Sequence, residues 1–159
     1  MRILITVLLF SGMVFADHLP TNLVARGKAE TTLCGIDVKH SHVSGLLEKL
    51  GEPATYDKYP KTEEAAEITW EKEGSKIHAT INVDDIAYAV EVSGAANAIA
   101  ATGKGLGLGQ TIADLRRIYG NRFWKHGDEI TVQWQDGTEL RAKFLNGRII
   151  SLLLIAPVE

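Results

Sequence analysis

The fold is decided by residues 130–155, which read ITVQWQDGTELRAKFLNGRIISLLLI. Three strand-like runs are separated here by Asp136-Gly137 and Asn146-Gly147, dipeptides that favour the tight turns of β-hairpins. In the middle run, apolar residues alternate with polar ones, which is typical of a strand with one buried face. The stretch therefore predicts three antiparallel strands joined by two hairpin turns.

A short helix is predicted directly before these strands, over residues 112–119. Thr111 and Asp114 have the spacing of a capping box at its start, and Gly120 can end it in a left-handed conformation. Between these signals, four residues recur at the spacing of one helical stripe: Ile112, Leu115, Ile118 and Tyr119. The helix should therefore bury this stripe against the strands that follow.

Residues 43–92 carry the same order of features. A helix with Ser41 as its expected N-cap ends at Gly51, and three strand-like runs follow it. Trp70 corresponds to Trp134 in the second copy, and both are expected in the core. We therefore predict an α+β fold of two tandem helix-plus-three-strand repeats, which form a shared antiparallel sheet with helices on one face.

The N-terminal segment has the features of an export signal. Arg2 precedes an apolar stretch over residues 3–10, and cleavage is expected after Ala16. The stretch is too short to span a bilayer, for which about 20 apolar residues are needed. We therefore expect an exported protein that is periplasmic or secreted and does not span a membrane.

One compact domain is expected after the signal peptide. The predicted parts of the chain are a signal peptide (1–16), an N-terminal arm (17–35), repeat 1 (36–92), an Ala/Gly-rich crossover (93–105) and repeat 2 (106–159). Cleavage removes Arg2 as the only charged residue of the signal peptide, so the formal net charge changes from −3 to −4. Because charges of both signs are interspersed, no nucleic-acid-binding surface is expected.

Cys34 is the only cysteine, so an intramolecular disulfide is impossible. Its neighbours Leu33 and Ile36 are apolar, which favours a buried thiol. Availability of the thiol to an external partner is the alternative. Stability must in either case come from packing.

Asp37, His40 and His42 are close enough in sequence to be considered as metal ligands. The two histidines would point the same way only in an extended segment, and no third nitrogen or thiolate ligand follows at a recognised spacing. Two solvated histidines near the start of a helix are the simpler interpretation. Binding of a small molecule or a metal is therefore kept as the alternative function, and no cofactor is expected.

The sequence offers no constellation for catalysis. In the glycine-rich residues 103–111, Lys104 follows the first glycine instead of preceding Thr111, which differs from a phosphate-binding loop. Neither a nucleophile elbow nor a convincing carboxylate pair occurs elsewhere. We therefore expect a protein that is not an enzyme.

The last strand-like run, residues 149–155, is apolar on both of its faces. By analogy with the first copy, one set of side chains should face the helices: Ile149, Leu153 and Ile155. The other set should lie on the opposite face: Ile150, Leu152 and Leu154. These are either covered by the N-terminal arm or exposed to a partner.

Residues 36–155 share their layout with a known group of folds, more closely in the second copy than in the first, where His42 stands in place of Thr111. Residues 108–115, LGQTIADL, lead to Gly120 and are followed by Trp134, the Asp136-Gly137 turn and a final apolar strand. This layout resembles the tandem repeats of the beta-lactamase inhibitor protein and the small lipoprotein of the outer-membrane barrel-assembly machinery. The resemblance implies an exported bacterial binding module with no chemistry of its own. The lipoprotein's acylated cysteine and the inhibitor's disulfides are absent, so beta-lactamase inhibition is not implied.

We expect this module to recognise a protein partner in the cell envelope or outside the cell. Binding should use the open sheet face and the adjacent loops, where aromatic and charged side chains dominate recognition. The candidates on the face are His78, Arg141 and Lys143. The candidates in loops are Phe123 and Trp124 after the second helix, and Tyr56 and Tyr59 in the long connection after the first. For Phe123 and Trp124, packing of their loop onto the core is the alternative.

Overall fold

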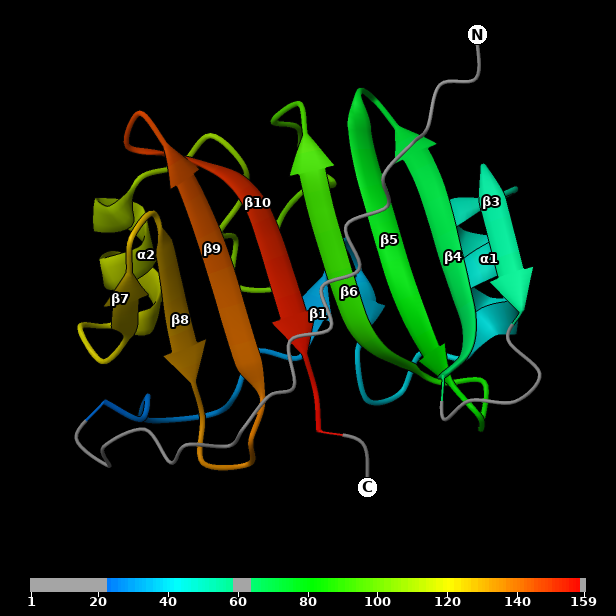
Figure 1. Cartoon of the computed structure of the whole chain (residues 1–159), viewed down its shortest axis with the longest axis horizontal. Helices are drawn as coiled ribbons and strands as arrows, with labels where there is room; N and C mark the ends of the chain where they lie inside the picture. Colours follow the sequence, from blue (N-terminus) through cyan, green and yellow to red (C-terminus); the bar gives the residue numbers. More distant parts are fainter. Residues whose placement is uncertain (1–22, 59–63, 158–159) are drawn as a thin grey trace, which may run out of the picture.

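Strands dominate residues 23–58 and 64–157, the parts of the chain that the computed structural model describes. The helices are α1 (Val43–Leu50) and α2 (Ile112–Tyr119). The strands are β1 (Thr32–Leu33), β2 (Ile36–Asp37), β3 (Thr55–Lys58), β4 (Glu64–Lys72), β5 (Ser75–Asn82), β6 (Ala87–Gly94), β7 (Trp124–His126), β8 (Glu129–Gln133), β9 (Glu139–Leu145) and β10 (Arg148–Ile155). Figure 1 shows the main sheet, whose antiparallel strands have the order β3-β4-β5-β6-β10-β9-β8-β7, while β1 and β2 form a separate hairpin.

The predicted fold class is wrong. The described residues form an eight-stranded antiparallel sheet with two helices of eight residues each, instead of two helix-plus-three-strand repeats. The edge strands β3 and β7 lie where we expected loops. Their few residues are mostly exposed and carry no alternating apolar pattern, so they are strands only because β4 and β8 offer them backbone hydrogen bonds. The protein is therefore mainly β-sheet.

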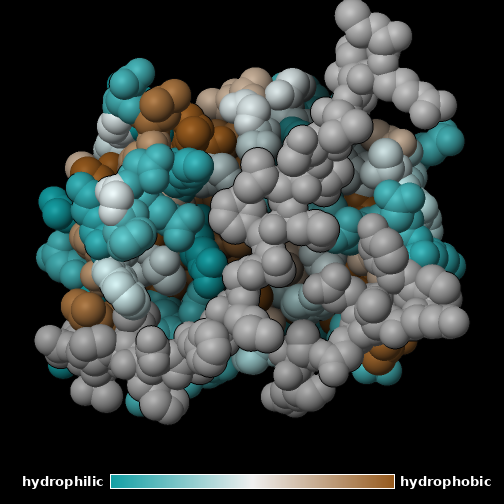
Figure 2. All heavy atoms as spheres, in the orientation of Figure 1, coloured by the Kyte–Doolittle hydropathy of each residue, from teal (hydrophilic) through white to brown (hydrophobic). Residues whose placement is uncertain are grey.

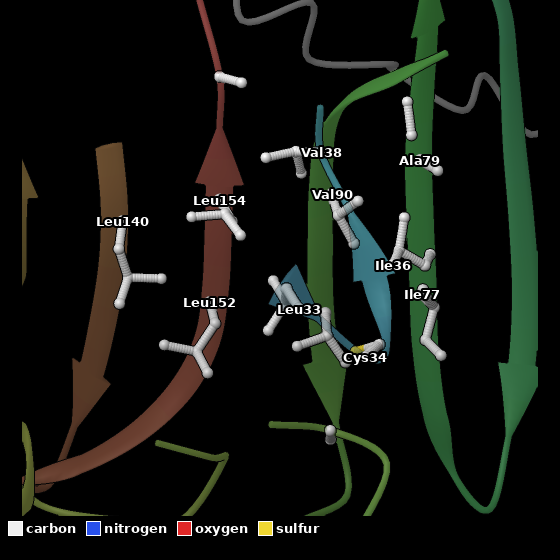
Figure 3. Close-up of a cluster of buried hydrophobic side chains, with 14 of the residues drawn as sticks. Leu33, Cys34, Ile36, Val38, Ile77, Ala79, Val90, Leu140, Leu152 and Leu154 are labelled. Carbon is white, nitrogen blue, oxygen red and sulfur yellow. The ribbon is translucent and has the colours of Figure 1, made fainter. Parts of the chain in front are cut away.

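One face of the sheet is covered by α1, α2 and the β1–β2 hairpin, which lie behind it in Figure 1. Each helix spans only about 12 Å, whereas eight strands span about 34 Å, so the helices cannot cover the sheet alone. Figure 3 shows how the hairpin fills the centre, with Leu33 and Ile36 lying over Val90 and Leu152. All four side chains are fully buried. We call this the covered face.

The two tryptophans predicted for the core are confirmed there, at 0% exposure for Trp70 and 4% for Trp134. The Trp70 indole Nε1 donates a hydrogen bond to the Gly51 carbonyl at the end of α1 (3.0 Å). Trp134 instead packs edge-on against Tyr119 at the end of α2, with ring centroids 5.7 Å apart. Each tryptophan therefore ties the sheet to the last turn of one helix.

The start of α2 has the predicted capping box. The backbone N–H of Asp114 donates to Thr111 Oγ1 (3.4 Å), and the backbone N–H of Thr111 donates to Asp114 Oδ2 (3.0 Å). These two bonds satisfy N–H groups that a helix start otherwise leaves without partners.

The start of α1 is built differently, and the prediction of Ser41 as its N-cap is wrong. His42 is the N-cap and makes no side-chain capping hydrogen bond. The N–H of Val43 donates instead to the Asp85 carbonyl in the β5–β6 turn (3.0 Å), while Ser41 Oγ accepts from Asp37 N (2.9 Å). A tertiary contact thus replaces the local cap.

A β-bulge in β10 decides which of its side chains reach the core. The register with β9 shifts between Ile149 and Ser151, which makes Ile150 the inserted residue. Ile149 lies on the covered face, and after the bulge Leu152 and Leu154 do so as well, both at 0% exposure. After the bulge, the side chains that a regular strand would place on the opposite face therefore lie on the covered face, and the others lie on the opposite face.

This exchange corrects our assignment of Leu153 and Ile155 to the helix-covered face. Leu153 pairs with Glu91 and Arg141, and Ile155 pairs with Glu139, so both lie half-buried on the opposite face. A single inserted residue reverses the parity of every later position, and a run that is apolar on both faces gives no sign of it.

Glu30 is a buried carboxylate that fastens the segment before β1 to the rest of the protein. It is 4% exposed and accepts hydrogen bonds from the N–H groups of Thr32 (3.0 Å) and Lys104 (3.1 Å). The Tyr119 hydroxyl donates to Glu30 Oε2 (2.8 Å) and lies 2.7 Å from Thr102 Oγ1. Burial, followed by the neighbouring Glu30 charge, raises the pKa of Tyr119, so its hydroxyl keeps the proton that it donates.

No helix among residues 23–58 and 64–157 is long and apolar enough to cross a membrane.

Candidate partner-binding face

The open face is the face of the eight-stranded sheet opposite the helices, and it is turned toward the viewer in Figure 1. The strand register aligns one row of side chains across it: Thr69, His78, Glu91, Leu153, Arg141, Thr131 and Trp124, in the order β4-β5-β6-β10-β9-β8-β7. Within the described ranges, no helix or further strand lies over this row. The register therefore aligns residues from seven strands on one face, where Thr69 is buried at 8% exposure and the other six residues are partly or fully exposed.

His78 and Glu91 lie opposite each other at the centre of the β5–β6 pair. His78 Nδ1 lies 3.0 Å from Thr69 Oγ1, and Glu91 Oε1 accepts a hydrogen bond from the Ser151 hydroxyl (3.0 Å). Lys76 and Ser93 complete a hollow of about 360 Å³ around them. The hollow thus presents an ammonium group, a carboxylate and an imidazole side by side.

Arg141 is held in a fixed position beside β8 and β10. Its Nε and Nη2 donate to Glu139 Oε2 (3.2 and 2.9 Å), and Gln133 Nε2 donates to Glu139 Oε1 (3.1 Å). The Arg141 side chain retains 30% exposure, so part of its guanidinium faces solvent. Lys143, two residues further along β9, is exposed on the same face. The Arg141 guanidinium is therefore oriented by contacts within the protein, and a group oriented in advance loses less entropy when it binds.

Trp124 and Phe123 have different surroundings despite being neighbours. Trp124 begins β7 and is 49% exposed at the end of the row. Phe123 is half-buried against the core, and the Arg116 guanidinium lies 5.6 Å from its ring centre. The structure therefore brings Trp124 to the open face, while Phe123 has the alternative environment that we considered, a loop packed onto the core.

The two tyrosine candidates do not join this row. Tyr56 pairs with Ile68, so it lies on the covered face, where it packs against the core. The Lys58 ammonium lies 5.3 Å from the centre of its ring. Tyr59 lies outside the described residues.

The three candidate metal ligands lie along the connection from β2 to α1. His40 Nδ1 lies 3.1 Å from Asp37 Oδ1, and the His40 side chain is 77% exposed. His42 is the N-cap of α1 and bridges to Ile86. The structure thus brings together Asp37 and His40, and the described residues contain no group of three or more His, Cys, Asp or Glu side chains placed to hold a metal ion.

Cys34 is buried at 3% exposure, as predicted. Burial raises the pKa of its thiol to about 12, against the smaller opposing effect of a hydrogen bond with the Ala101 backbone. The thiol is therefore protonated at neutral pH and is a poor nucleophile.

Four residues of the row escaped the sequence prediction: Thr69, Glu91, Thr131 and Leu153. Three of them follow from simple alternation within β4, β6 and β8, where buried neighbours define the other face. Leu153 does not, because the bulge in β10 reverses its parity.

Comparison with known proteins gives a likeness of fold alone. No protein-family model and no curated protein matches the chain. A solved structure of a cysteine-rich secretory protein from Staphylococcus aureus matches with a TM-score of 0.52 at 11% identity, covering 73% of this chain and 44% of that one. A DUF4309 family protein from Bacillus subtilis matches with a TM-score of 0.51 at 18% identity, covering 77% of this chain and 83% of that one. This chain thus spans less than half the length of the staphylococcal protein.

Neither comparison tests the resemblance to the beta-lactamase inhibitor protein or to the small lipoprotein, which remains a prediction. At 11% and 18% identity, the similar structures carry no information about the partner of this chain.

Proposed function

We propose that this protein is an exported, non-catalytic binding module whose open face recognises a segment of a protein partner. The row from His78 to Trp124 is the observation that carries the proposal. It combines an exposed tryptophan, an oriented arginine and the half-buried Leu153 on a surface that no described helix or strand covers. Tryptophan and arginine are enriched among the residues that dominate binding energy at interfaces.

The size of the row suits a short structural element of a partner. Five strand spacings separate His78 from Trp124, or about 24 Å, which an extended segment of about seven residues or a helix of about 16 residues spans. Leu153, between the charged Glu91 and Arg141, offers the partner an apolar contact at the middle of the row. Opposite charges on either side of it would fix the direction in which the segment lies.

The proposal retains His78, Arg141, Lys143 and Trp124 as partner-binding residues. Phe123 and Tyr56 are not retained, because they pack against the core. The expected signal peptide, which lies outside the described residues, places the partner in the cell envelope or outside the cell.

Site-specific photo-crosslinking tests the proposal directly. p-Benzoylphenylalanine at Thr131, between Trp124 and Arg141 in the row, should form a discrete adduct with a protein in living cells of the source organism. The matched control places the same residue at Ala113, which is exposed on α2 beneath the covered face. Adducts of equal yield at both positions, or none at Thr131, would contradict the proposal.

A second experiment asks whether the row supplies the binding energy. The double variant Trp124→Ala/Arg141→Ala should reduce the Thr131 adduct at least tenfold, since truncating a hot-spot residue costs about 2 kcal/mol or more. Arg117→Ala, on the exposed side of α2, is the control and should leave the yield unchanged. Equal adducts from the double variant and the control would show that these side chains do not recognise the partner.

A further inference from the structure

The β9–β10 tip, residues 143–150, exposes two large aliphatic side chains. Leu145 ends β9 with 59% of its surface exposed, and Ile150 in β10 is 37% exposed. Leu145 pairs with Arg148, which stands two residues before Ile150, so the two aliphatic side chains occupy the same end of the hairpin. Figure 2 shows hydrophobic surface at the end of the molecule where Figure 1 places the β9–β10 turn.

Backbone geometry makes this exposure a fixed property of the tip. Asn146 and Gly147 both have positive φ angles (51° and 74°), which is the geometry of a tight type I′ turn. Such a turn holds Leu145 at the end of the strand, beyond the reach of the core. Ile150 is directed outward because it is the inserted residue of the bulge.

The two charged residues of the tip itself are both basic. They are Lys143 and Arg148, and both residues are exposed. Arg148 Nη1 donates to the Gly109 carbonyl (3.0 Å), which holds the cation beside the turn. Two acidic residues lie beside the tip. Glu129 in β8 pairs with Lys143, which pairs with Ser151 on its other side. Asp128 lies in the β7–β8 turn, and its backbone carbonyl accepts a hydrogen bond from the N–H of Phe144 (2.8 Å).

The β5–β6 turn provides an internal contrast at the opposite end of the sheet (Figure 1). Val83 there is even more exposed than Leu145, at 65%, but it is followed by Asp84 and Asp85. An anionic lipid surface attracts aliphatic side chains accompanied by lysine and arginine, and it repels aspartate. Only one of these two exposed aliphatic tips has charges that complement such a surface.

We propose that the β9–β10 tip is a peripheral contact with an anionic lipid surface. Leu145 and Ile150 enter the headgroup region, and Lys143 and Arg148 lie at the level of the phosphates. The open face, on the broad side of the sheet, stays accessible to a protein partner in this orientation. Leu145, Ile150 and Arg148 lie outside the row from His78 to Trp124, and Lys143 is the one residue that both proposals use, so Leu145 tests the lipid contact separately from the proposed function.

The first experiment places an environment-sensitive fluorophore at each tip of the full chain. NBD is attached through Leu145→Cys or Val83→Cys in a Cys34→Ala background. Vesicles of phosphatidylcholine with phosphatidylglycerol should shift the emission of the probe at position 145 to the blue, and vesicles of phosphatidylcholine alone should not. The probe at position 83 should respond to neither. Because both labelled variants contain the apolar residues 3–10, binding through that stretch cannot produce a difference between the two probes.

The second experiment measures partition of unlabelled variants onto the phosphatidylglycerol vesicles. Lys143→Gln/Arg148→Gln should weaken partition by about fivefold for each cation removed, and Leu145→Ser should weaken it further. Lys58→Gln and Val83→Ser, at the opposite end of the sheet, are the matched controls and should partition like the wild type. Thermal unfolding of each variant confirms that it is folded.

Three outcomes of these two experiments would overturn the proposal. They are an unchanged emission at position 145, an equal response at positions 145 and 83, and equal partition of the tip variants and their controls. A response that inorganic phosphate alone reproduces would assign the tip to free anions and would equally exclude a lipid contact.

Discussion

The two faces of the eight-stranded sheet are built from the same strands and differ in what their side chains do. On the covered face, Val90, Leu152 and Leu154 are fully buried beneath the β1–β2 hairpin and stabilise the fold. On the open face, their immediate neighbours Glu91 and Leu153 take part in a row of solvent-facing side chains. Residues that stabilise the fold and residues of the proposed binding face are therefore separated by a single step along the chain. Substitutions on one face should therefore leave the property of the other face intact.

The largest expected effect is the difference in the free energy of unfolding between substitutions of Leu154 and of Leu153. Leu154→Ala should lower the free energy of unfolding by about 2–5 kcal/mol, because it leaves a cavity in the core. Leu153→Ala should lower it by less than about 1 kcal/mol, since this half-buried side chain leaves no closed cavity. Urea unfolding measures both. Similar costs for the two variants would show that the bulge does not divide β10 between the faces as described.

A smaller difference in stability is expected between substitutions of two carboxylates, Glu30 and Glu91. Glu30→Gln places an amide group among hydrogen-bond donors and should cost about 1–3 kcal/mol of stability. Glu91→Gln retains an oxygen for the Ser151 hydroxyl and should change stability by less than about 0.5 kcal/mol. Equal midpoints of thermal unfolding for the two variants would argue against a structural role for the Glu30 cluster.

The smallest expected effect is a difference in stability between substitutions at the N-caps of the two helices. Thr111→Ala removes the capping box of α2 and should cost about 1 kcal/mol, whereas His42→Ala should cost almost nothing because His42 makes no side-chain cap. Chemical unfolding of this pair provides the measurement. A cost for His42→Ala as large as that for Thr111→Ala would reveal a capping contact that the structure does not contain.

The same capping box predicts a dependence on pH. The backbone hydrogen bond from Thr111, then the Thr111 hydroxyl and Arg117, hold the pKa of Asp114 below its usual value. A lowered pKa in the folded state means that the contribution is complete above the unfolded-state value of about 3.9 and is lost as the pH falls through the folded-state value. The difference in Tm between wild type and Asp114→Asn should therefore be constant near neutral pH and should narrow in acid. A difference in Tm that becomes larger in acid would contradict the lowered pKa of Asp114.

Much of the local structure was predictable because it depends on residues close in sequence. The ends of both helices at Gly51 and Gly120, the capping box at Thr111 and the Asn146-Gly147 turn were predicted and are confirmed. The candidate face was predictable in part. His78 and Arg141 were assigned to it from the alternation of their strands, and the register places them in one row.

The remainder was not predictable because its causes lie far apart in sequence. The edge strands β3 and β7 have no pattern of their own, which is why the predicted number of strands per half was wrong. No pattern in the sequence marks Glu30 as a buried residue, because its partner Tyr119 lies 89 positions away. Leu153 was assigned to the wrong face because a bulge leaves no mark in a run of apolar residues.

For this protein, the sequence by itself determined where the chain turns, where both helices end, where α2 begins, and which residues are apolar enough to be buried. These features arise from backbone preferences and hydrogen bonds that act within a few residues. The tertiary structure alone decided the width of the sheet, the bulge in β10 and the alignment of His78, Arg141 and Trp124 across separate strands. These depend on backbone pairing between strands that meet only when the chain has folded, so no short stretch of sequence contains them.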